Sequence, residues 1–263
     1  MADGAQWETV DRGWGRLAAD FAALFEPANV REYAALHHLL AVSAGDRLLD
    51  VACGSGLAIE LAGLRGAACA GLDASGRLVA IARDRSPDAD IRVGDMAALP
   101  WPDERFDVVT SFRGIWATTP GALTEAHRVL RRGGRFGLTA WGHLKRSPGA
   151  WALAPLGLAE PPQVQHQSDM NQIGRPGRGE QLLAEAGFVE IERHELRMVW
   201  EFADPAHYVR AIGSSGPAYE AIQAVGRAEF ETRALELAAA RVRDGLPLRA
   251  EIHLAGFTAR RPG

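Results

Sequence analysis

The chain has 263 residues, of which 47% are hydrophobic, and this is enough apolar sequence for one large domain with a sizeable core. Its net charge of -4 at pH 7, with lysine and arginine scattered along the sequence, gives no global field that would attract nucleic acid or an anionic membrane. The amino-terminal residues lack the apolar core of a signal peptide, and the best apolar run, WALAPLGLA, is short and broken by Pro155, so we expect a soluble, cytoplasmic protein without stable membrane insertion.

Two helical patterns occupy residues 5–42, ahead of the first predicted strand. From residue 46 onward, short runs typical of strands alternate with helical patterns, which predicts a parallel sheet with crossover helices. The predicted strands of this part are RLLDVA (47–52), AACAGLD (67–73), DIRVGD (90–95), FDVVTSF (106–112) and RFGLTAW (135–141), and the predicted helices cover 57–65, 76–85 and 120–131.

The alternation stops after Trp141. Residues 142–176 are rich in proline, glycine and polar residues and are long for a connection inside a compact domain; such loops are usually functional lids or disordered. The alternation resumes with a helix at 179–188 and a long strand at 189–202. Helical patterns over 204–242 and a final strand at 248–261 complete the chain.

We therefore expect a single α/β domain with three helical or irregular parts outside the alternating core. They are an amino-terminal cap (1–45) and two insertions (142–176 and 204–242), and the core between them covers 46–141. In an open α/β sheet, ligands bind at the carboxyl ends of the strands, where such additions can close over them. We interpret the three parts as a substrate cap.

One stretch carries a binding motif: LLDVACGSGLAIEL, residues 48–61. Gly54 and Gly56 allow a tight turn and a close approach of a ligand to the backbone, and the helix that begins near Leu57 offers unpaired N–H groups. A dinucleotide would need a third small residue where this chain has Ile59, and Asp50 would repel its pyrophosphate. The stretch therefore favours a ligand with a cationic group near Asp50.

S-adenosylmethionine is a ligand of this kind, and LLDVACGSG resembles the first motif of the class I S-adenosylmethionine-dependent methyltransferases. GLDAS (71–75), VGDMAALPWPDERFDVV (93–109) and ALTEAHRVLRRGGRFGLTAW (122–141) resemble the motifs that follow in this family, in the branch of the ubiquinone and menaquinone methyltransferases. The resemblance covers about residues 46–141. It implies a doubly wound, Rossmann-like, mostly parallel seven-stranded sheet with helical cap insertions.

The resemblance also implies roles for individual residues at the cofactor. Asp73 would accept both ribose hydroxyls, which suits a carboxylate in a partly dry cleft. Asp50 would order the glycine loop by accepting backbone N–H bonds and would meet the ammonium group directly or through water. Asp95 would face the exocyclic amine of adenine, or alternatively cap a helix at MAAL, and Met96 would pack on the ring. The full set of expected cofactor contacts is Tyr33, Asp50, Ala52, Gly54, Gly56, Asp73, Ala74, Asp95, Met96 and Ser111.

The acceptor side departs from the family pattern, because SFRGIW stands where many relatives carry histidine. Arg113 either meets a polar group of the ligand or forms a surface salt bridge. Trp116 and Trp141 either pack or stack on the acceptor, and Tyr33 either offers its hydroxyl or packs. With His143, the residues Arg113, Trp116 and Trp141 form our expected acceptor site.

His166 is the candidate general base, because polar neighbours could orient its imidazole; the alternative is a solvated loop histidine. The two cysteines, Cys53 and Cys69, lack the spacing of a disulfide framework or a zinc site, so we expect no metal. Cys53 is interpreted as a small buried residue rather than a nucleophile.

The sequence thus predicts methyl transfer from S-adenosylmethionine to a small organic acceptor at oxygen, carbon or nitrogen, mainly by alignment of the reacting atoms. A mostly apolar cap with tryptophan and tyrosine favours a partly hydrophobic acceptor. Two alternatives remain open at this point. One is a protein that uses the same cofactor site for cyclisation or decarboxylation, and the other is a nicotinamide oxidoreductase.

Overall fold

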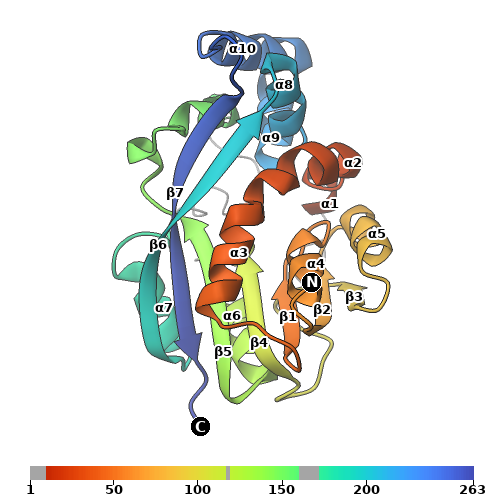
Figure 1. The fold of residues 1–263 in the computed structure, drawn as a ribbon, viewed down its shortest axis with the longest axis vertical. Coiled ribbons are helices and arrows are strands. Elements are labelled where there is room, and N and C mark those ends of the chain that lie inside the picture. Colours follow the sequence, from red (N-terminus) through yellow and green to blue (C-terminus); the bar gives the residue numbers. More distant parts are fainter. Residues whose placement is uncertain (1–9, 117–118, 160–171) are drawn as a thin grey trace, which may run out of the picture.

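The computed structural model describes residues 10–116, 119–159 and 172–263, and Figure 1 shows their arrangement. One seven-stranded sheet has the order β3-β2-β1-β4-β5-β7-β6. The strands are β1 (Arg47–Val51), β2 (Ala68–Asp73), β3 (Asp90–Val93), β4 (Phe106–Phe112), β5 (Leu130–Trp141), β6 (Val189–Phe202) and β7 (Leu248–Arg260). All neighbours pair in parallel except β7, which is antiparallel to both β5 and β6. The predicted doubly wound, mostly parallel sheet is confirmed.

Helices cover both faces of this sheet. In chain order they are α1 (Val10–Gly13), α2 (Ala18–Asp20), η2 (Phe21–Phe25), η3 (Glu26–Asn29), α3 (Val30–Leu39), α4 (Leu57–Gly63), α5 (Gly76–Arg85), α6 (Pro120–Val129), η4 (Leu144–Arg146), η5 (Ala150–Leu158), α7 (Arg178–Glu185), α8 (Pro205–Gly213), α9 (Gly216–Val225) and α10 (Arg227–Ala239). Successive residues of β1 pack on opposite faces of the sheet. Leu48 packs in one core cluster with Leu36 of α3 and Ala62 of α4, whereas Leu49 packs in another with Leu123 of α6. The core therefore has a helical layer on each face, as buried parallel strands require.

The hairpin of β6 and β7 is longer than the sheet it joins. Only residues 254–260 of β7 pair with β5, whereas residues 248–253 pair with β6 alone. The far half of the hairpin therefore continues beyond the carboxyl end of β5 and carries α8, α9 and α10, as Figure 1 shows. This extension positions the cap above the carboxyl edge of the sheet.

A second apolar core holds the cap together. It combines side chains from the hairpin extension, the carboxyl-terminal helices, η5 and the amino-terminal helices, and includes Phe21, Phe25, Trp141, Ala152, Trp200, Phe202, Tyr208 and Phe230. The Tyr208 hydroxyl donates to the Ala152 carbonyl at 2.9 Å, which ties α8 to η5. The three cap segments predicted from the sequence thus share one core, and in the described residues η4 and η5 replace part of the expected 142–176 loop.

Residues 18–39 form one helical path whose geometry changes along its length. The chain passes from α2 through the π-helical η2 and the 3-10 helix η3 into α3. Pro27 has no backbone N–H to give to a helical ladder, which accounts for the change of geometry at η3. Among the described residues, no helix is long and apolar enough to cross a membrane.

Candidate functional site

Asp50 is the penultimate residue of β1 and Asp73 is the last residue of β2; the two strands are parallel neighbours, and both side chains are buried. Oδ2 of Asp73 accepts the backbone N–H of Gly54 at 2.8 Å, and Oδ1 accepts that of Ser75 at 2.8 Å. Burial raises the pKa of Asp73, while its backbone hydrogen bonds oppose the rise. Asp73 is thus the carboxylate that fixes the glycine loop.

This arrangement corrects our expectation for Asp50, which was to order the same loop. Oδ1 of Asp50 instead accepts the hydroxyl of Thr110 on β4 at 2.7 Å. Burial raises the pKa of Asp50 to about 8; the Thr110 hydrogen bond opposes the rise, and the negative charges of Glu26, Asp73 and Glu32 add to it. No arginine or lysine in the described residues forms an ion pair with Asp50 or Asp73. A bound cation would therefore be stabilised beside them.

The two motif glycines do different things. Both have positive φ, +57° at Gly54 and +85° at Gly56, as the neighbouring Ala52 also has. A Cβ at Gly56 would lie 2.7 Å from the Cβ of Ala82 on α5, so this glycine permits close packing of α4 and α5. A Cβ at Gly54 would point to Glu26 and Phe21 at 3.5 and 3.6 Å, an ordinary contact distance. Gly54 therefore faces the amino-terminal helices.

Glu26 of η3 lies against the glycine loop. It is buried and accepts hydrogen bonds from the hydroxyl of Ser55 in the glycine loop and from the guanidinium of Arg85 on α5. Burial raises the pKa of Glu26 even though these donors oppose the rise. Ahead of this segment, the Ser75 hydroxyl donates to Asp11. The amino-terminal residues thus contact the loops that follow both β1 and β2.

The carboxyl ends of β4 and β5 hold a buried ion pair. Arg113 Nη2 lies 3.0 Å from Glu32 Oε2, and the Arg113 and Glu32 side chains are only 9% and 0% exposed. The Thr139 hydroxyl donates to the same carboxylate at 2.5 Å, and the guanidinium lies 5.0 Å from the centroid of the Trp141 ring. Our surface salt bridge alternative for Arg113 is wrong, because its partner sits on the buried face of α3.

Two further expected cofactor contacts lie beside this pair. Tyr33 is buried, accepts a hydrogen bond from Asn29 at 3.4 Å and packs edge-on against Phe112. Burial raises its pKa well above the usual range of a tyrosine. Ser111 is completely buried at the end of β4, and its hydroxyl has no hydrogen-bond partner in the described residues. An unpartnered buried hydroxyl is costly, so it fits a ligand atom at this position.

The remaining predicted residues are dispersed around the edge. Asp95 accepts the Ala97 N–H at 2.9 Å in a turn rather than capping a helix, and Met96 packs against the core. Trp116 donates its indole N–H to the Arg113 carbonyl at 3.0 Å, and Ala74 follows Asp73 half-buried. His143 is exposed at the start of η4, so the structure gives no support for its place over the acceptor. His166 lies outside the described residues.

Both cysteines are free, and Cys53 is buried with a strongly raised thiol pKa, mainly because of burial. A thiol of this kind is a poor nucleophile, in agreement with its interpretation as a packing residue. The described residues contain no group of histidine, cysteine, aspartate or glutamate side chains that could hold a metal ion.

Sequence reasoning missed Glu26 and Glu32. A signal was present, because Glu26, Asn29 and Glu32 recur every three residues between the buried Phe25 and Leu36, on the face of the helices that meets the core. Charged residues on an apolar helix face are unusual unless they are paired. The pattern could have indicated buried partners, but it does not identify Arg85 or Arg113.

Among the described residues, the site therefore combines two buried carboxylates without cationic partners, a loop with no side chain at Gly54, and an unpartnered serine hydroxyl. A cationic ligand that also donates hydrogen bonds to Asp73 fits these groups. The buried acids disfavour a pyrophosphate.

Comparison with known proteins agrees with this chemistry. The family described as "Methyltransferase domain" matches residues 49–138. The 27-O-demethylrifamycin SV methyltransferase of Amycolatopsis mediterranei is 29% identical over 85% of this chain and 84% of its own length. An uncharacterized methyltransferase of Synechocystis sp. is 32% identical over 59% of this chain and 72% of its own. The demethylmenaquinone methyltransferase of Tropheryma whipplei is 35% identical, over 41% of this chain and 47% of its own.

Solved structures share the fold at low sequence identity. The YcgJ protein of Bacillus subtilis superposes with a TM-score of 0.58 at 16% identity, covering 88% of this chain and 98% of that one. The [4+2]-cyclase SpnF superposes with a TM-score of 0.54 at 21% identity, covering 88% and 81%. At these identities the structures establish the fold alone, whereas the sequence relatives establish the family. The chain belongs to the S-adenosylmethionine-dependent methyltransferases.

Proposed function

We propose that this methyltransferase acts on a hydroxyl oxygen of a partly hydrophobic small molecule, bound between the carboxyl ends of β4 and β5 and the cap. Membership of the family establishes methyl transfer from S-adenosylmethionine to a small acceptor. The class of acceptor, the methylated atom and the residues that hold both ligands belong to the proposal.

The main support for this proposal is the position of Trp141. Its ring contacts both Arg113, of the Arg113–Glu32 ion pair, and the aromatic core of the cap. Trp141 ends β5, lies against the guanidinium of Arg113 at 5.0 Å, and packs edge-on against Trp200 with 6.4 Å between the ring centroids. An acceptor beside Arg113 would thus meet aromatic and aliphatic surface from the cap. Such surroundings favour a hydrophobic molecule with a few polar groups.

The residues proposed to hold the cofactor follow from the site. Asp73 would accept the ribose hydroxyls with the lone pairs that its two backbone hydrogen bonds leave free. Asp50 and the unpartnered Ser111 hydroxyl would face the charged methionine end, together with Tyr33, Ala52, Gly54 and Gly56. Ala74, Asp95 and Met96 would line the adenine side. The bound cofactor supplies an electrophilic methyl group on a positively charged sulfur.

The chain's own contribution to the reaction is alignment. Glu32, whose carboxylate also accepts the Thr139 hydroxyl, fixes the Arg113 side chain, and the φ of +58° at Arg113 turns the backbone sharply after β4. Removing Glu32 would leave a buried charge unpaired, which typically costs about 3–5 kcal/mol. Arg113 is therefore held in one orientation, from which it can position a polar group of the acceptor.

We propose oxygen as the methylated atom because the relative whose alignment includes most of this chain is named for an O-demethylated compound. The relative named for 27-O-demethylrifamycin SV aligns over 85% of this chain, whereas the demethylmenaquinone methyltransferase aligns over 41%. Because the cap would contact the acceptor, likeness in the cap says more about the acceptor than likeness in the core. A hydroxyl must lose its proton, and His166 is the proposed base.

The test is transfer of labelled methyl groups from S-adenosylmethionine to matched panels of hydrophobic hydroxyl compounds and amines, with product masses located by fragmentation. We expect label on hydroxyl oxygen of the bulkier acceptors. Trp141→Leu should raise the KM for the acceptor while the Kd for the cofactor stays unchanged. Label on nitrogen or carbon only, or a preference for small polar acceptors, would refute the proposal.

His166 is tested separately. His166→Ala should lower kcat by about 100-fold with cofactor affinity intact, and His38→Ala, at an exposed histidine of α3, serves as the control. A fall of less than about threefold would remove the base and leave alignment as the main contribution.

A further inference from the structure

The turn between α10 and β7 presents two aliphatic side chains to solvent. Arg243 and Leu246 form an isolated bridge, the Leu246 N–H donates to the Arg243 carbonyl at 3.1 Å, and Gly245 has a φ of +67°. Val242 and Leu246 on this tight turn are 56% and 55% exposed. Figure 1 places the end of α10 and the start of β7 at the extremity of the molecule opposite the carboxyl terminus. A flat surface could therefore reach both side chains.

Three arginines surround a hollow at the same extremity. Arg241, Arg243 and Arg249 line it together with Pro148 and Trp151. The Arg241 guanidinium lies 4.7 Å from the centroid of the Trp151 ring and donates to the Leu237 carbonyl at 2.7 Å, so it is held in place. The three arginines come from a helix end, a tight turn and a strand, and all are exposed.

These arginines differ from the others on the cap. Arg227 and Arg233 of α10 pair with Glu231 and Glu229 one helical turn away. Arg241, Arg243 and Arg249 form no ion pair with any of the described residues. Two acids lie near them: Asp244 on the same turn, and Glu201, which is opposite Arg249 in the β6–β7 ladder and pairs with Arg31. The three arginines outnumber these acids, so a chain whose net charge is -4 carries a local excess of positive charge at this end. Because arginines are scattered along the sequence, this local cluster is not evident from the sequence alone.

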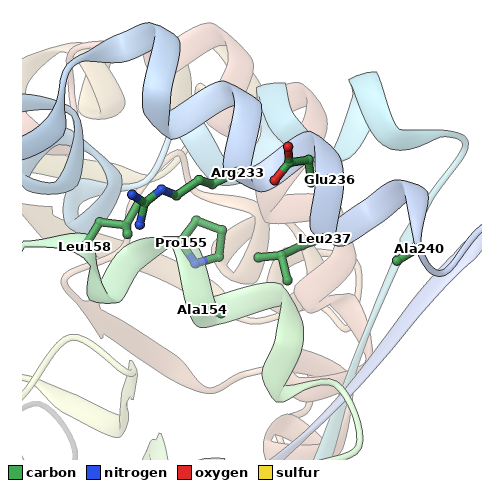
Figure 2. A pocket seen from close by; sticks show the side chains of 7 residues that line it. All are labelled: Ala154, Pro155, Leu158, Arg233, Glu236, Leu237 and Ala240. Atoms are coloured by element: carbon green, nitrogen blue, oxygen red, sulfur yellow. The ribbon is translucent and has the colours of Figure 1, made fainter.

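A mostly apolar groove, lined also by Arg233 and Glu236, continues from the hollow along α10, and the two share Ala240. Figure 2 shows Ala154, Pro155 and Leu158 of η5 on one side of the groove and Leu237 of α10 on the other. The extremity therefore combines exposed aliphatic side chains, an apolar groove and unpaired positive charge.

We propose that this end of the cap, defined by Arg241, Val242, Arg243, Leu246 and Arg249, docks on the surface of a bilayer that contains anionic lipid. Guanidinium groups bind lipid phosphates at the headgroup level, and the two aliphatic side chains enter the boundary between headgroups and acyl chains. The overall negative charge repels the rest of the protein from such a surface, so contact is limited to this end. The inference goes beyond the proposed function and does not depend on the acceptor.

The experiment is sedimentation of the full chain with vesicles, without acceptor or cofactor. One set contains three parts phosphatidylcholine to one part phosphatidylglycerol, and the other contains phosphatidylcholine alone. At about 0.1 M NaCl we expect at least tenfold stronger partitioning to the anionic vesicles, with a fall at higher salt as charges are screened. Because no methyl transfer is measured, failure here leaves the proposed function untouched.

Variants with matched controls locate the surface. The triple change R241Q/R243Q/R249Q should lower the partition coefficient about 100-fold, at roughly fivefold per arginine. The control R65Q/R105Q/R132Q has the same net charge but alters exposed arginines near the amino ends of the strands, and should bind like the wild type. V242S/L246S should lower partitioning about tenfold, whereas L64S, at an 80% exposed leucine elsewhere, should not.

Three results would overturn the proposal. They are equal binding to both kinds of vesicle, equal losses in the two arginine triples, and release of the bound chain by millimolar inorganic phosphate at constant ionic strength. The last result would identify the hollow as a site for a small anion instead of a bilayer surface.

Discussion

Asp73 holds the loops after β1 and β2, and we propose that it also binds the cofactor. Each carboxylate oxygen accepts one backbone N–H and retains a lone pair, which the proposal assigns to a ribose hydroxyl. Asp73→Ala removes both functions, so the affinity for S-adenosylmethionine should fall by roughly 1.5–3 kcal/mol, the range for hydrogen bonds to charged groups. Titration calorimetry gives the Kd directly.

Asp88→Ala is the matched control for Asp73, because it removes an exposed acid between α5 and β3 and should leave the Kd unchanged. A folded Asp73→Ala variant with wild-type affinity would exclude Asp73 from the cofactor site.

If Asp50 lies beside the charged end of the cofactor, as proposed, cofactor binding should depend on pH. The pKa of Asp50 is raised to about 8, chiefly by burial, so at neutral pH its carboxyl is mostly protonated, and a cation bound beside it favours the ionised form. Binding then releases a proton, and the affinity should fall up to tenfold per unit as the pH falls from about 8 to 6. Calorimetry in buffers of different ionisation enthalpy measures the released proton.

Asp50→Asn keeps the shape of the side chain and cannot ionise. This variant should bind more weakly at about pH 8 and show a flat pH profile below it. Identical profiles for Asp50→Asn and the wild type would assign the proton to another group.

At the level of elements, the two glycines of the loop should differ in function: Gly54 is proposed to serve ligand binding, whereas Gly56 permits the packing of α4 against α5. Gly54→Val should abolish cofactor binding while the fold survives, because its Cβ meets only ordinary contacts from Glu26 and Phe21. The positive φ costs the variant about 1–2 kcal/mol of stability. Thermal unfolding and calorimetry on the same sample distinguish the two effects.

Gly56→Val provides the contrast for Gly54→Val. Its Cβ would lie 2.7 Å from Ala82 on α5, so this variant should lose stability first and binding as a consequence. Wild-type cofactor affinity in Gly54→Val would show that the loop is placed wrongly relative to the ligand.

Helix α3 carries a buried histidine that links stability to pH. His37 is fully buried against Phe112, neither ring nitrogen has a hydrogen-bond partner in the described residues, and burial together with the charge of Arg65 lowers its pKa to about 4. The unfolded chain takes up a proton near pH 6.5, whereas the folded chain does so only near pH 4. The stabilising contribution is therefore present above pH 6.5 and is lost as the pH falls towards 4.

Between about pH 7 and pH 5 we expect this histidine to lower the free energy of unfolding by on the order of 2 kcal/mol. Urea unfolding of the wild type and of His37→Leu measures the difference, and His38→Gln, at an exposed neighbour, is the control. If His37→Leu loses as much stability as the wild type over this range, another group is responsible.

The sequence predicts the local elements of the site better than its long-range contacts. Strand β1 and the helix after it follow from the hydrophobic pattern and the glycines, because local sequence largely determines them. The contact of Arg113 with Glu32 joins residues 81 positions apart, and the hydrogen bond from the Gly54 N–H to Asp73, in place of Asp50, joins residues 19 positions apart. Such features arise from tertiary packing, which one sequence does not contain as a local pattern.

At the level of the whole molecule, the amino-terminal helices lie between the core of the cap and the loop proposed to bind the cofactor. Phe25 packs on Trp200 in the cap core with ring centroids 5.0 Å apart, while the adjacent Glu26 contacts Ser55 and Arg85 at the glycine loop. The same segment therefore contacts both the glycine loop and the core of the cap. We expect a ligand bound at the loop to change the dynamics of this segment.

This coupling predicts an order of protection from hydrogen exchange. S-adenosylmethionine alone should slow exchange of backbone amides in residues 18–29, because Phe21 and Glu26 lie against Gly54 where the cofactor is proposed to bind. Amides of η5, which contact the cap but not the loop, should slow only when an acceptor is added, as a lid that closes over both ligands requires. Amides in the paired region of β5 and β7 are the internal control and should exchange at one rate throughout. Equal exchange of residues 18–29 with and without cofactor would show that these helices are a fixed wall and that access to the site is governed elsewhere.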